Sequence, residues 1–214
     1  MEVFGGLHAF VWRDTRANNC NTYLIDGSKK IVIDPGHAHL FTQIDYELAR
    51  LSLTVDDIDV VIATHGHPDH FEAAGRFAGS ARFAMGHDEY WLVKEFLGRY
   101  MEIPEPDFFL QEGDLTIGDE TFEIIATPGH TPGEICIYWP RKKVLFSGDV
   151  VFKGSIGRSD LPGGDGRQLK ASIEILAQLD VEYLLPGHGE VISGKDAVEQ
   201  NFEMIEQAWF SYLG

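Results

Sequence analysis

Short apolar segments typical of β-strands alternate with amphipathic helical segments along most of the chain. Apolar residues recur at helical spacing through Leu40, Ile44, Leu48 and Leu51, whereas residues 58–63 form a nearly continuous apolar run, typical of a strand buried on both faces. The predicted strands comprise residues 3–12, 21–25, 30–33, 58–63, 81–85, 121–127, 134–139, 143–148 and 183–185. The other predicted helices comprise residues 71–77, 88–99 and 167–179, with a last one at the C-terminus. This alternation predicts an α/β fold in which helices cover packed sheets.

Turn signals separate several of these segments. Asp26-Gly27 lies between two predicted strands and predicts a β-hairpin. The proline pair at 104 and 106 interrupts the pattern, so we expect residues 108–109 to lie in a loop. Residues 154–166 form a glycine-rich loop before the next helix.

The C-terminal segment has the pattern of an amphipathic helix. Its apolar face comprises Val198, Phe202, Ile205, Trp209 and Leu213. Ser193, followed three residues later by Asp196, predicts a capping box at the start of this helix. We expect the apolar face to pack on a sheet.

The composition is that of an ordinary globular protein, with 214 residues of which 44% are apolar and 24% are charged. We expect a single domain spanning residues 1–214. Seventeen Lys and Arg residues against 34 Asp and Glu residues give a formal net charge of −17. Such a charge repels phosphate backbones and anionic lipids, so it counts against nucleic-acid and membrane partners and leaves a small-molecule substrate.

Cysteine usage and hydropathy favour a cytoplasmic location. Cys20 and Cys136 are the only cysteines, and they lie far apart in strand patterns, so we expect two small apolar core residues in a reducing compartment. The segment MEVFGGLHAFVWRD lacks the basic region and the cleavage site of a signal peptide. No uninterrupted apolar run reaches the ~18 residues of a membrane span.

The histidines are concentrated where predicted strands end. His65-Gly-His67-Pro-Asp69-His70 brings three imidazoles and a carboxylate together directly after the apolar run 58–63. A lone His-x-His pair would be read as a polar loop. Four ligand-type side chains at the end of a strand instead indicate a metal site, because ligands of α/β folds bind at the carboxyl ends of strands.

Three further strand ends present a ligand-type residue after a tight turn. They are Pro128-Gly129-His130, Gly148-Asp149 and Pro186-Gly187-His188. Glycine and proline there permit sharp turns, so we expect all four loops to open on one edge of the fold. Imidazole and carboxylate without thiolate suit zinc, manganese or iron, and seven ligands suit two ions.

These seven residues resemble the signature of the metallo-β-lactamase superfamily. The HxHxDH motif corresponds to His65, His67, Asp69 and His70, and His130, Asp149 and His188 follow in the order of the family. The resemblance extends over nearly the whole chain and implies a four-layered αβ/βα sandwich, the metallo-β-lactamase fold. It also implies two divalent metal ions, with zinc expected before iron or manganese.

The resemblance further implies a role for each ligand. His65, His67 and His130 would hold one ion, Asp69, His70 and His188 the second, and Asp149 would bridge the two. Asp69 and Asp149 are also the expected catalytic carboxylates. Asp34 is expected to orient a ligand histidine. The other histidines receive structural roles: His37 at a helix N-terminus, and His8, His39 and His87 at the surface or in packing.

The glycine-rich loop narrows the subgroup. It resembles the corresponding loop of small glyoxalase II-like hydrolases, and its Gly-Arg-Ser-Asp core also resembles the persulfide dioxygenases. In glyoxalase II a basic residue at the position of Arg158 holds a carboxylate of the glutathione moiety. Arg158 can instead brace its own loop against Asp160 or Asp165. Lys195 is the only base after His188, unlike the basic C-terminal region of glyoxalase II, so glutathione recognition stays open.

The function expected from these features is hydrolysis of a small acyl thioester by a binuclear metallo-hydrolase of the hydroxyacylglutathione hydrolase type. Divalent ions supply the nucleophile by lowering the pKa of a bound water, and no GxSxG nucleophile motif is present. The alternative is a mononuclear Fe(II) persulfide dioxygenase, in which His65, His130 and Asp149 would bind one iron. The oligomeric state is left open.

Overall fold

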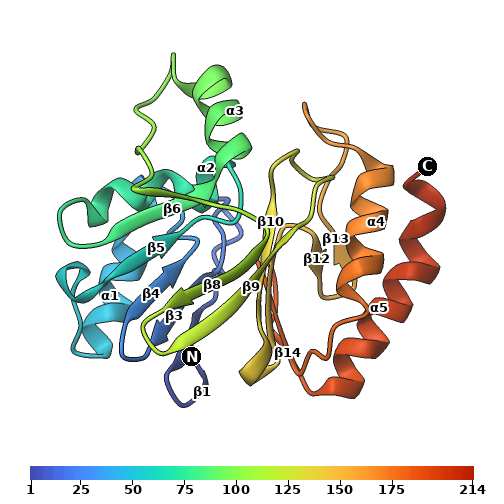
Figure 1. Cartoon of the computed structure of the whole chain (residues 1–214), viewed down its shortest axis with the longest axis horizontal. Coiled ribbons are helices and arrows are strands. Elements are labelled where there is room, and N and C mark those ends of the chain that lie inside the picture. The colour runs from blue at the N-terminus through green and yellow to red at the C-terminus, as the bar shows by residue number, and fades with distance from the viewer. The chain divides into compact units, whose positions relative to one another are not determined.

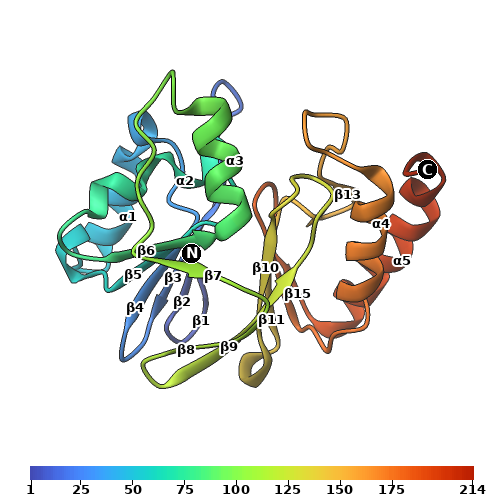
Figure 2. The same ribbon diagram turned by 45° about the horizontal axis from the view of Figure 1, so that its top comes forward.

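The computed structural model describes residues 1–214, which divide into two compact units. Unit 1 comprises Met1–Leu110 with Ile117–Asp119, and unit 2 comprises Gln111–Thr116 with Glu120–Gly214. Each unit contains one large sheet and its own helices (Figures 1 and 2). That residues 1–214 form one domain stays a prediction.

The sheet of unit 1 has seven strands in sequential order, of which β1 to β4 are antiparallel and β4 to β7 are parallel. They are β1 (Glu2–Phe4), β2 (Leu7–Phe10), β3 (Thr22–Asp26), β4 (Lys30–Ile33), β5 (Val60–Ile62), β6 (Arg82–Gly86) and β7 (Phe108–Leu110). The hairpin predicted around Asp26-Gly27 joins β3 and β4, as expected. Because β4 and β5 are parallel, the segments that leave them begin at the same edge of the sheet.

Two predictions for unit 1 are wrong. Residues 3–12 form two strands instead of one, because the chain turns at Gly6, whose φ of 86° lies in the left-handed region that glycine adopts freely. Residues 108–109 lie in β7 and not in a loop. The prolines precede this strand, and Phe108 pairs with Ala84 of β6 at the edge of the sheet.

One face of this sheet is covered by the helices of unit 1. They are α1 (Thr42–Arg50), α2 (Pro68–Phe71) and α3 (His87–Leu97), with the 3₁₀ helices η1 (Ala38–Leu40), η2 (Val55–Asp57) and η3 (Glu72–Phe77). Leu24 and Val61 of the sheet share one apolar cluster with Leu48 of α1, and all three are fully buried. Burying such a side chain contributes about 1.5–3 kcal/mol, so this cluster fixes the helices on the sheet.

The sheet of unit 2 has six strands in the order β15-β14-β11-β10-β9-β8. They are β8 (Gly113–Ile117), β9 (Glu120–Ala126), β10 (Ile135–Trp139), β11 (Val144–Gly148), β14 (Tyr183–Pro186) and β15 (Ile192–Ser193), and β12 (Val151–Phe152) pairs separately with β13 (Ser155–Ile156). Within it, β11 and β14 are parallel neighbours. The strands on both sides of β10 run antiparallel to it, so β9, β11 and β14 all point the same way.

Two long helices, α4 (Gly166–Leu176) and α5 (Lys195–Trp209), lie side by side on one face of this sheet (Figure 2), and the 3₁₀ helices η4 (Pro140–Lys142) and η5 (Phe210–Tyr212) are short. The predicted apolar face of α5 is confirmed, since Val198 and Ile205 are buried in the cluster that also contains Cys136. The predicted capping box is wrong. Ser193 pairs with Tyr183 in the sheet, and Gly194 is the N-cap without a side-chain cap.

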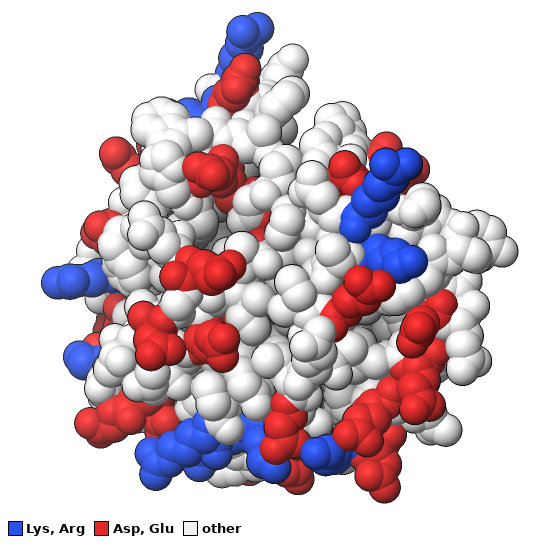
Figure 3. Space-filling view, turned by 45° about the vertical axis from the view of Figure 1, so that its right-hand side comes forward, with Lys and Arg blue, Asp and Glu red and all other residues white.

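Three general expectations can be compared with the structure. Cys20 and Cys136 form no disulfide and are buried, as predicted for core residues. No helix combines the length and the apolar character needed to cross a membrane. Acidic side chains predominate over basic ones on the face shown in Figure 3, in keeping with the net charge of −17.

Candidate metal centre

In unit 1 the ligand-type residues of the HxHxDH motif follow β5 directly. His65 is fully buried, and its Nε2 lies 3.0 Å from Nδ1 of His67. The rings of His65 and His70 are 4.0 Å apart between centroids. The three imidazoles therefore gather at the edge of the sheet, as the sequence predicted, although Asp69 and His70 lie on α2 rather than in a loop.

A helix begins inside the motif because its proline occupies the first turn. Pro68 stands at a position where its missing N–H costs nothing and its fixed φ suits a helix. The predicted helix 71–77 accordingly begins three residues earlier and continues as η3. Asp69 is buried, and its Oδ2 accepts a hydrogen bond of 2.6 Å from Nδ2 of Asn18.

Asp34 orients the motif from the end of β4, as predicted. Its Oδ2 lies 3.0 Å from Nδ1 of His70, and its carboxylate also accepts hydrogen bonds from the backbone N–H and the hydroxyl of Thr64. Asp34 is 1% exposed and has a φ of 54°, a left-handed conformation that aspartate tolerates. Since Nδ1 of His70 donates its hydrogen to the carboxylate, the lone pair of this imidazole lies on Nε2, where it can bind a metal.

Helix α3 supports the loop between His65 and His67. The buried Glu89 accepts a 2.8 Å hydrogen bond from the N–H of Gly66. A Cβ at Gly66 would lie 2.0 Å from Cγ2 of Val93 and 2.9 Å from Oε1 of Glu89. Only glycine therefore fits at the centre of the His-x-His pair.

In unit 2 the three predicted ligands also follow strand ends. His130 comes after β9, Asp149 after β11 and His188 after β14, and these strands point the same way. The N–H of Gly187 donates to the carbonyl of Gly148 at 2.7 Å, so the last two turns are joined directly. The prediction of a common edge therefore holds within this unit.

The carboxylate of Asp149 is the centre of this group. Its Oδ2 lies 3.5 Å from Nε2 of His130 and 3.5 Å from Nε2 of His188. Two ligand atoms of a tetrahedral ion with bonds of about 2.1 Å are about 3.4 Å apart. These separations therefore suit metal ligation on either side of the carboxylate.

Hydrogen bonds fix two members of the group. Nδ1 of His130 lies 2.6 Å from the carbonyl oxygen of Arg158, which can only accept, so the Nδ1 proton is donated there. The Nε2 lone pair of His130 is therefore turned toward Asp149. The backbone N–H of Asp149 donates to Oε1 of the buried Glu134 at 2.7 Å.

Arg158 forms an exposed pair with Asp160. Its Nε and Nη2 each donate a hydrogen bond of 2.9 Å to the two carboxylate oxygens. This pairing raises the pKa of Arg158 and lowers that of Asp160, chiefly through the side-chain hydrogen bonds. Asp165, the other predicted brace, instead caps α4 by accepting from the N–H groups of Arg167 and Gln168. Substrate binding by Arg158 stays a prediction.

The donor set fits divalent metal ions in both units. It contains imidazole and carboxylate without thiolate, and the hydrogen bonds of His70 and His130 leave the lone pair of Nε2 available for a metal. The remaining histidines also lie as predicted: His37 precedes η1, and His39 and His87 are exposed.

Two supporting residues were missed in the sequence analysis, namely Glu89 and Glu134. Both are 1% exposed, and both accept a backbone N–H within or next to a ligand motif. Glu134 opens the apolar run 134–139, and Glu89 lies beside the apolar residues of α3. A carboxylate within such a pattern is a usable signal, because buried carboxylates are rare unless they are hydrogen-bonded.

Comparisons with known proteins agree with this arrangement. Residues 15–188 match the Metallo-beta-lactamase superfamily. A probable metallo-hydrolase of Methanocaldococcus jannaschii is 35% identical over 186 residues, which cover 80% of this chain and 88% of that protein. The hydroxyacylglutathione hydrolase GloC of Haemophilus influenzae is 34% identical over 189 residues, which cover 80% of this chain and 85% of that protein.

A solved structure of similar sequence extends the comparison. The crystal structure of TTHA1623 in a di-iron-bound form superposes with a TM-score of 0.70 and 29% identity, covering 85% of this chain and 91% of that one. The family match, the relatives and the fold thus agree with one another. The chain belongs to the metallo-β-lactamase superfamily and is a metallo-hydrolase with the fold that the sequence predicted.

Proposed function

We propose that this protein is a binuclear metal-dependent hydrolase of a small acyl thioester. The observation that carries the proposal is the position of Asp149, whose Oδ2 is 3.5 Å from the Nε2 atoms of two different histidines. A carboxylate so placed suits a bridge between two ions. If the site held a single ion, the imidazoles of both His130 and His188 would not need to lie next to the same oxygen of Asp149.

The proposed ligand sets are those implied by the family. His65, His67 and His130 hold one ion, Asp69, His70 and His188 hold the other, and Asp149 bridges them. Zinc is the first choice, and iron or manganese is the alternative. The imidazole-rich donor set supports zinc, whereas the di-iron-bound form of TTHA1623 supports iron.

When bound, divalent ions polarise the substrate carbonyl and lower the pKa of water to about 7. The residues of the chain supply orientation and proton acceptance. Asp34 and the Arg158 carbonyl fix the rings of His70 and His130. Asn18 donates a hydrogen bond to Oδ2 of Asp69, which orients this carboxylate both as a ligand and as an acceptor for a proton of the attacking water. No side-chain nucleophile is required.

The thioester class is supported by the relative GloC, a hydroxyacylglutathione hydrolase, and by the glycine-rich loop that carries Arg158. The proposed partner is therefore a small-molecule thioester, without nucleic acid or membrane. The acidic surface in Figure 3 supports this choice, because it repels phosphate groups. The two buried cysteines, which form no disulfide, support a cytoplasmic location.

The proposal predicts two measurable properties of protein purified without added metal. Elemental analysis should give close to two ions per chain, and S-D-lactoylglutathione or a simpler acyl thioester should be hydrolysed. Hydrolysis of either thioester should consume no oxygen. The opposite result would be one tightly held iron per chain, oxygen uptake with glutathione persulfide and no cleavage of thioesters. It would contradict the proposal and indicate a mononuclear dioxygenase.

A second prediction concerns Arg158. If its guanidinium holds a substrate carboxylate, Arg158→Ala should raise KM for an anionic thioester by about ten- to a hundred-fold, the scale of a lost charged hydrogen bond. KM for a neutral thioester should stay nearly unchanged, because the contact is remote from the reacting carbonyl. Steady-state kinetics on the two substrates measure the difference.

The chain offers controls for this experiment. Arg16 makes the same two-hydrogen-bond pair with Asp14, also exposed, so Arg16→Ala should change neither KM. Asp160→Ala frees the guanidinium of Arg158 and should preserve or lower KM for the anionic substrate. If Arg158 only braces its loop, Asp160→Ala should match Arg158→Ala, and both substrates should suffer alike.

A further inference from the structure

A second group of metal-type side chains lies in unit 1, outside the seven proposed ligands. His37, His39 and Glu72 each offer a ligand atom, and these atoms lie within 4.8 Å of one another. Nδ1 of His37 is 2.6 Å from Oε2 of Glu72, and the two imidazole rings are 4.9 Å apart between centroids. Two nitrogen donors and one oxygen donor therefore converge at one place.

The backbone holds this group in position. The N–H of His37 donates to Oδ1 of Asn19 at 2.8 Å, and the N–H of Ala38 donates to Oε2 of Glu72 at 3.3 Å. The carbonyl of Gly36 accepts the N–H of Ala73 at 2.8 Å, which ties the start of η1 to η3. The His–Glu arrangement thus rests on two segments that are joined by backbone hydrogen bonds.

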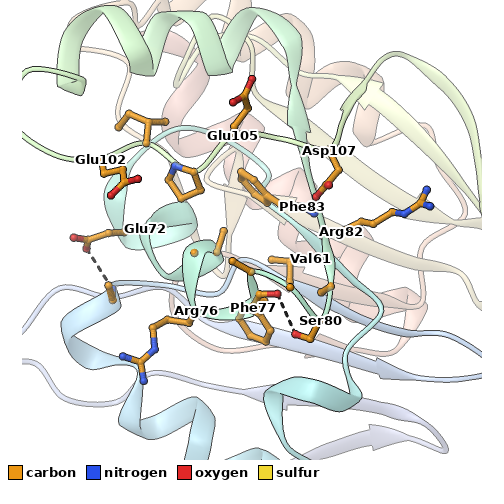
Figure 4. A pocket seen from close by; sticks show the side chains of 18 of the residues that line it. Val61, Glu72, Arg76, Phe77, Ser80, Arg82, Phe83, Glu102, Glu105 and Asp107 are labelled. Atoms are coloured by element: carbon orange, nitrogen blue, oxygen red, sulfur yellow. Dashed lines mark hydrogen bonds between the residues drawn. The ribbon is translucent and has the colours of Figure 1, made fainter.

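Ions can reach the group from solvent. His39 is exposed, whereas the side chains of His37 and Glu72 are partly buried, at 20% and 27% exposure. Glu72 also lines an open cavity of about 1110 Å³ and is drawn at its edge in Figure 4, with the hydrogen bond to η1 dashed. The nearest basic residue on η3, Arg76, packs over the ring of Phe41 at 5.0 Å.

We propose that His37, His39 and Glu72 form a third metal site, which takes a divalent transition-metal ion. Two imidazoles and one carboxylate match the preferences of zinc, nickel and cobalt, and a site with one carboxylate holds magnesium or calcium poorly. The ion replaces the proton that now lies between Nδ1 of His37 and Oε2 of Glu72. The net charge of −17 raises the local cation concentration around it.

The site is separate from the proposed catalytic ligands but linked to them. The N–H of Gly36 donates to the carbonyl of His70 at 3.3 Å, and Asp34 lies two residues before Gly36. An ion held by His37 and Glu72 connects η1 with the segment that follows His70. The number of ions bound per chain in a metal titration should therefore be one more than the number of catalytic ions.

The test titrates Ni²⁺ into the metal-loaded protein by calorimetry, with elemental analysis to verify that the resident ions are retained. Wild type should bind one further equivalent. His39→Gln, at an exposed position that leaves folding intact, should weaken this binding at least about tenfold, and so should Glu72→Gln. Mg²⁺ should not compete.

His87 provides a matched control. It is exposed, its Nδ1 is 2.8 Å from Oδ1 of Asp88, and it belongs to no group of three ligands. His87→Gln should leave the additional equivalent unchanged, and thioester hydrolysis should be normal in both histidine variants. Equal losses in His39→Gln and His87→Gln, or no further equivalent in wild type up to roughly 1 mM Ni²⁺, would overturn the third site without affecting the proposed hydrolase.

Discussion

Replacing Asp149 by Asn should lower the rate of thioester hydrolysis by about 10³-fold or more, the scale of removing a central electrostatic element. Oδ2 of Asp149 lies 3.5 Å from the Nε2 atoms of both His130 and His188. An amide keeps the shape of the side chain but is neutral, and one of its two ends is a donor that cannot ligate a metal. The variant should therefore lose metal as well as activity.

Folding is expected to survive this substitution. The backbone N–H of Asp149 bonds to Glu134, and asparagine retains that hydrogen bond. The measurements are kcat/KM on an acyl thioester, ions per chain by elemental analysis and Tm, with the exposed Asp114→Asn as a carboxylate control. A loss of less than tenfold with two ions still bound would show that Asp149 is no bridge.

Replacing Gly66 by Ala should disable the metal loop through packing alone. The added methyl group would lie 2.0 Å from Cγ2 of Val93 and 2.9 Å from Oε1 of Glu89, so either the loop or α3 must move. Overpacking of this kind costs about 1–3 kcal/mol. A displacement of about 1 Å at a reacting group can cost 10²-fold in rate. Because His65 and His67 flank the glycine, metal content should fall with activity.

Thermal unfolding and elemental analysis test this expectation, with Tm falling by roughly 2–4 °C for each kcal/mol in a chain of this size. Gly75→Ala is the matched control. Its Cβ would meet nothing nearer than Cγ of Pro104 at 3.8 Å, and its φ is not positive. Normal Tm and normal metal content in Gly66→Ala would mean that α3 does not hold the loop.

The strand ends that carry the candidate ligands could be predicted because each depends on local sequence. A buried strand, a turn rich in glycine or proline and a ligand-type side chain recur at His65, His130 and His188. The position of Asp34 after β4 was likewise sufficient to predict that it orients a histidine, and its contact with His70 confirms this. Such features are set by chain neighbours, which the sequence displays directly.

Features that depend on distant neighbours were not predicted. Glu89 acts on Gly66 only because α3 packs against the loop, and no local pattern records that contact. Pairing with β6 makes a strand of Phe108–Leu110, although two prolines precede it. Ser193 cannot cap α5, since it is paired with Tyr183 in the sheet. In each case tertiary packing overrides a local preference.

The ring of His130 is held by the main chain of residue 158, not by its side chain. Every amino acid offers the same carbonyl, so this support survives any substitution at 158 that keeps the backbone path. The peptide group and the side chain of residue 158 therefore have independent roles. The peptide group orients His130, whereas the side chain can change without disturbing that contact. Under the proposed role of Arg158, a substitution at this position would change which substrates the enzyme accepts and leave the orientation of His130 intact.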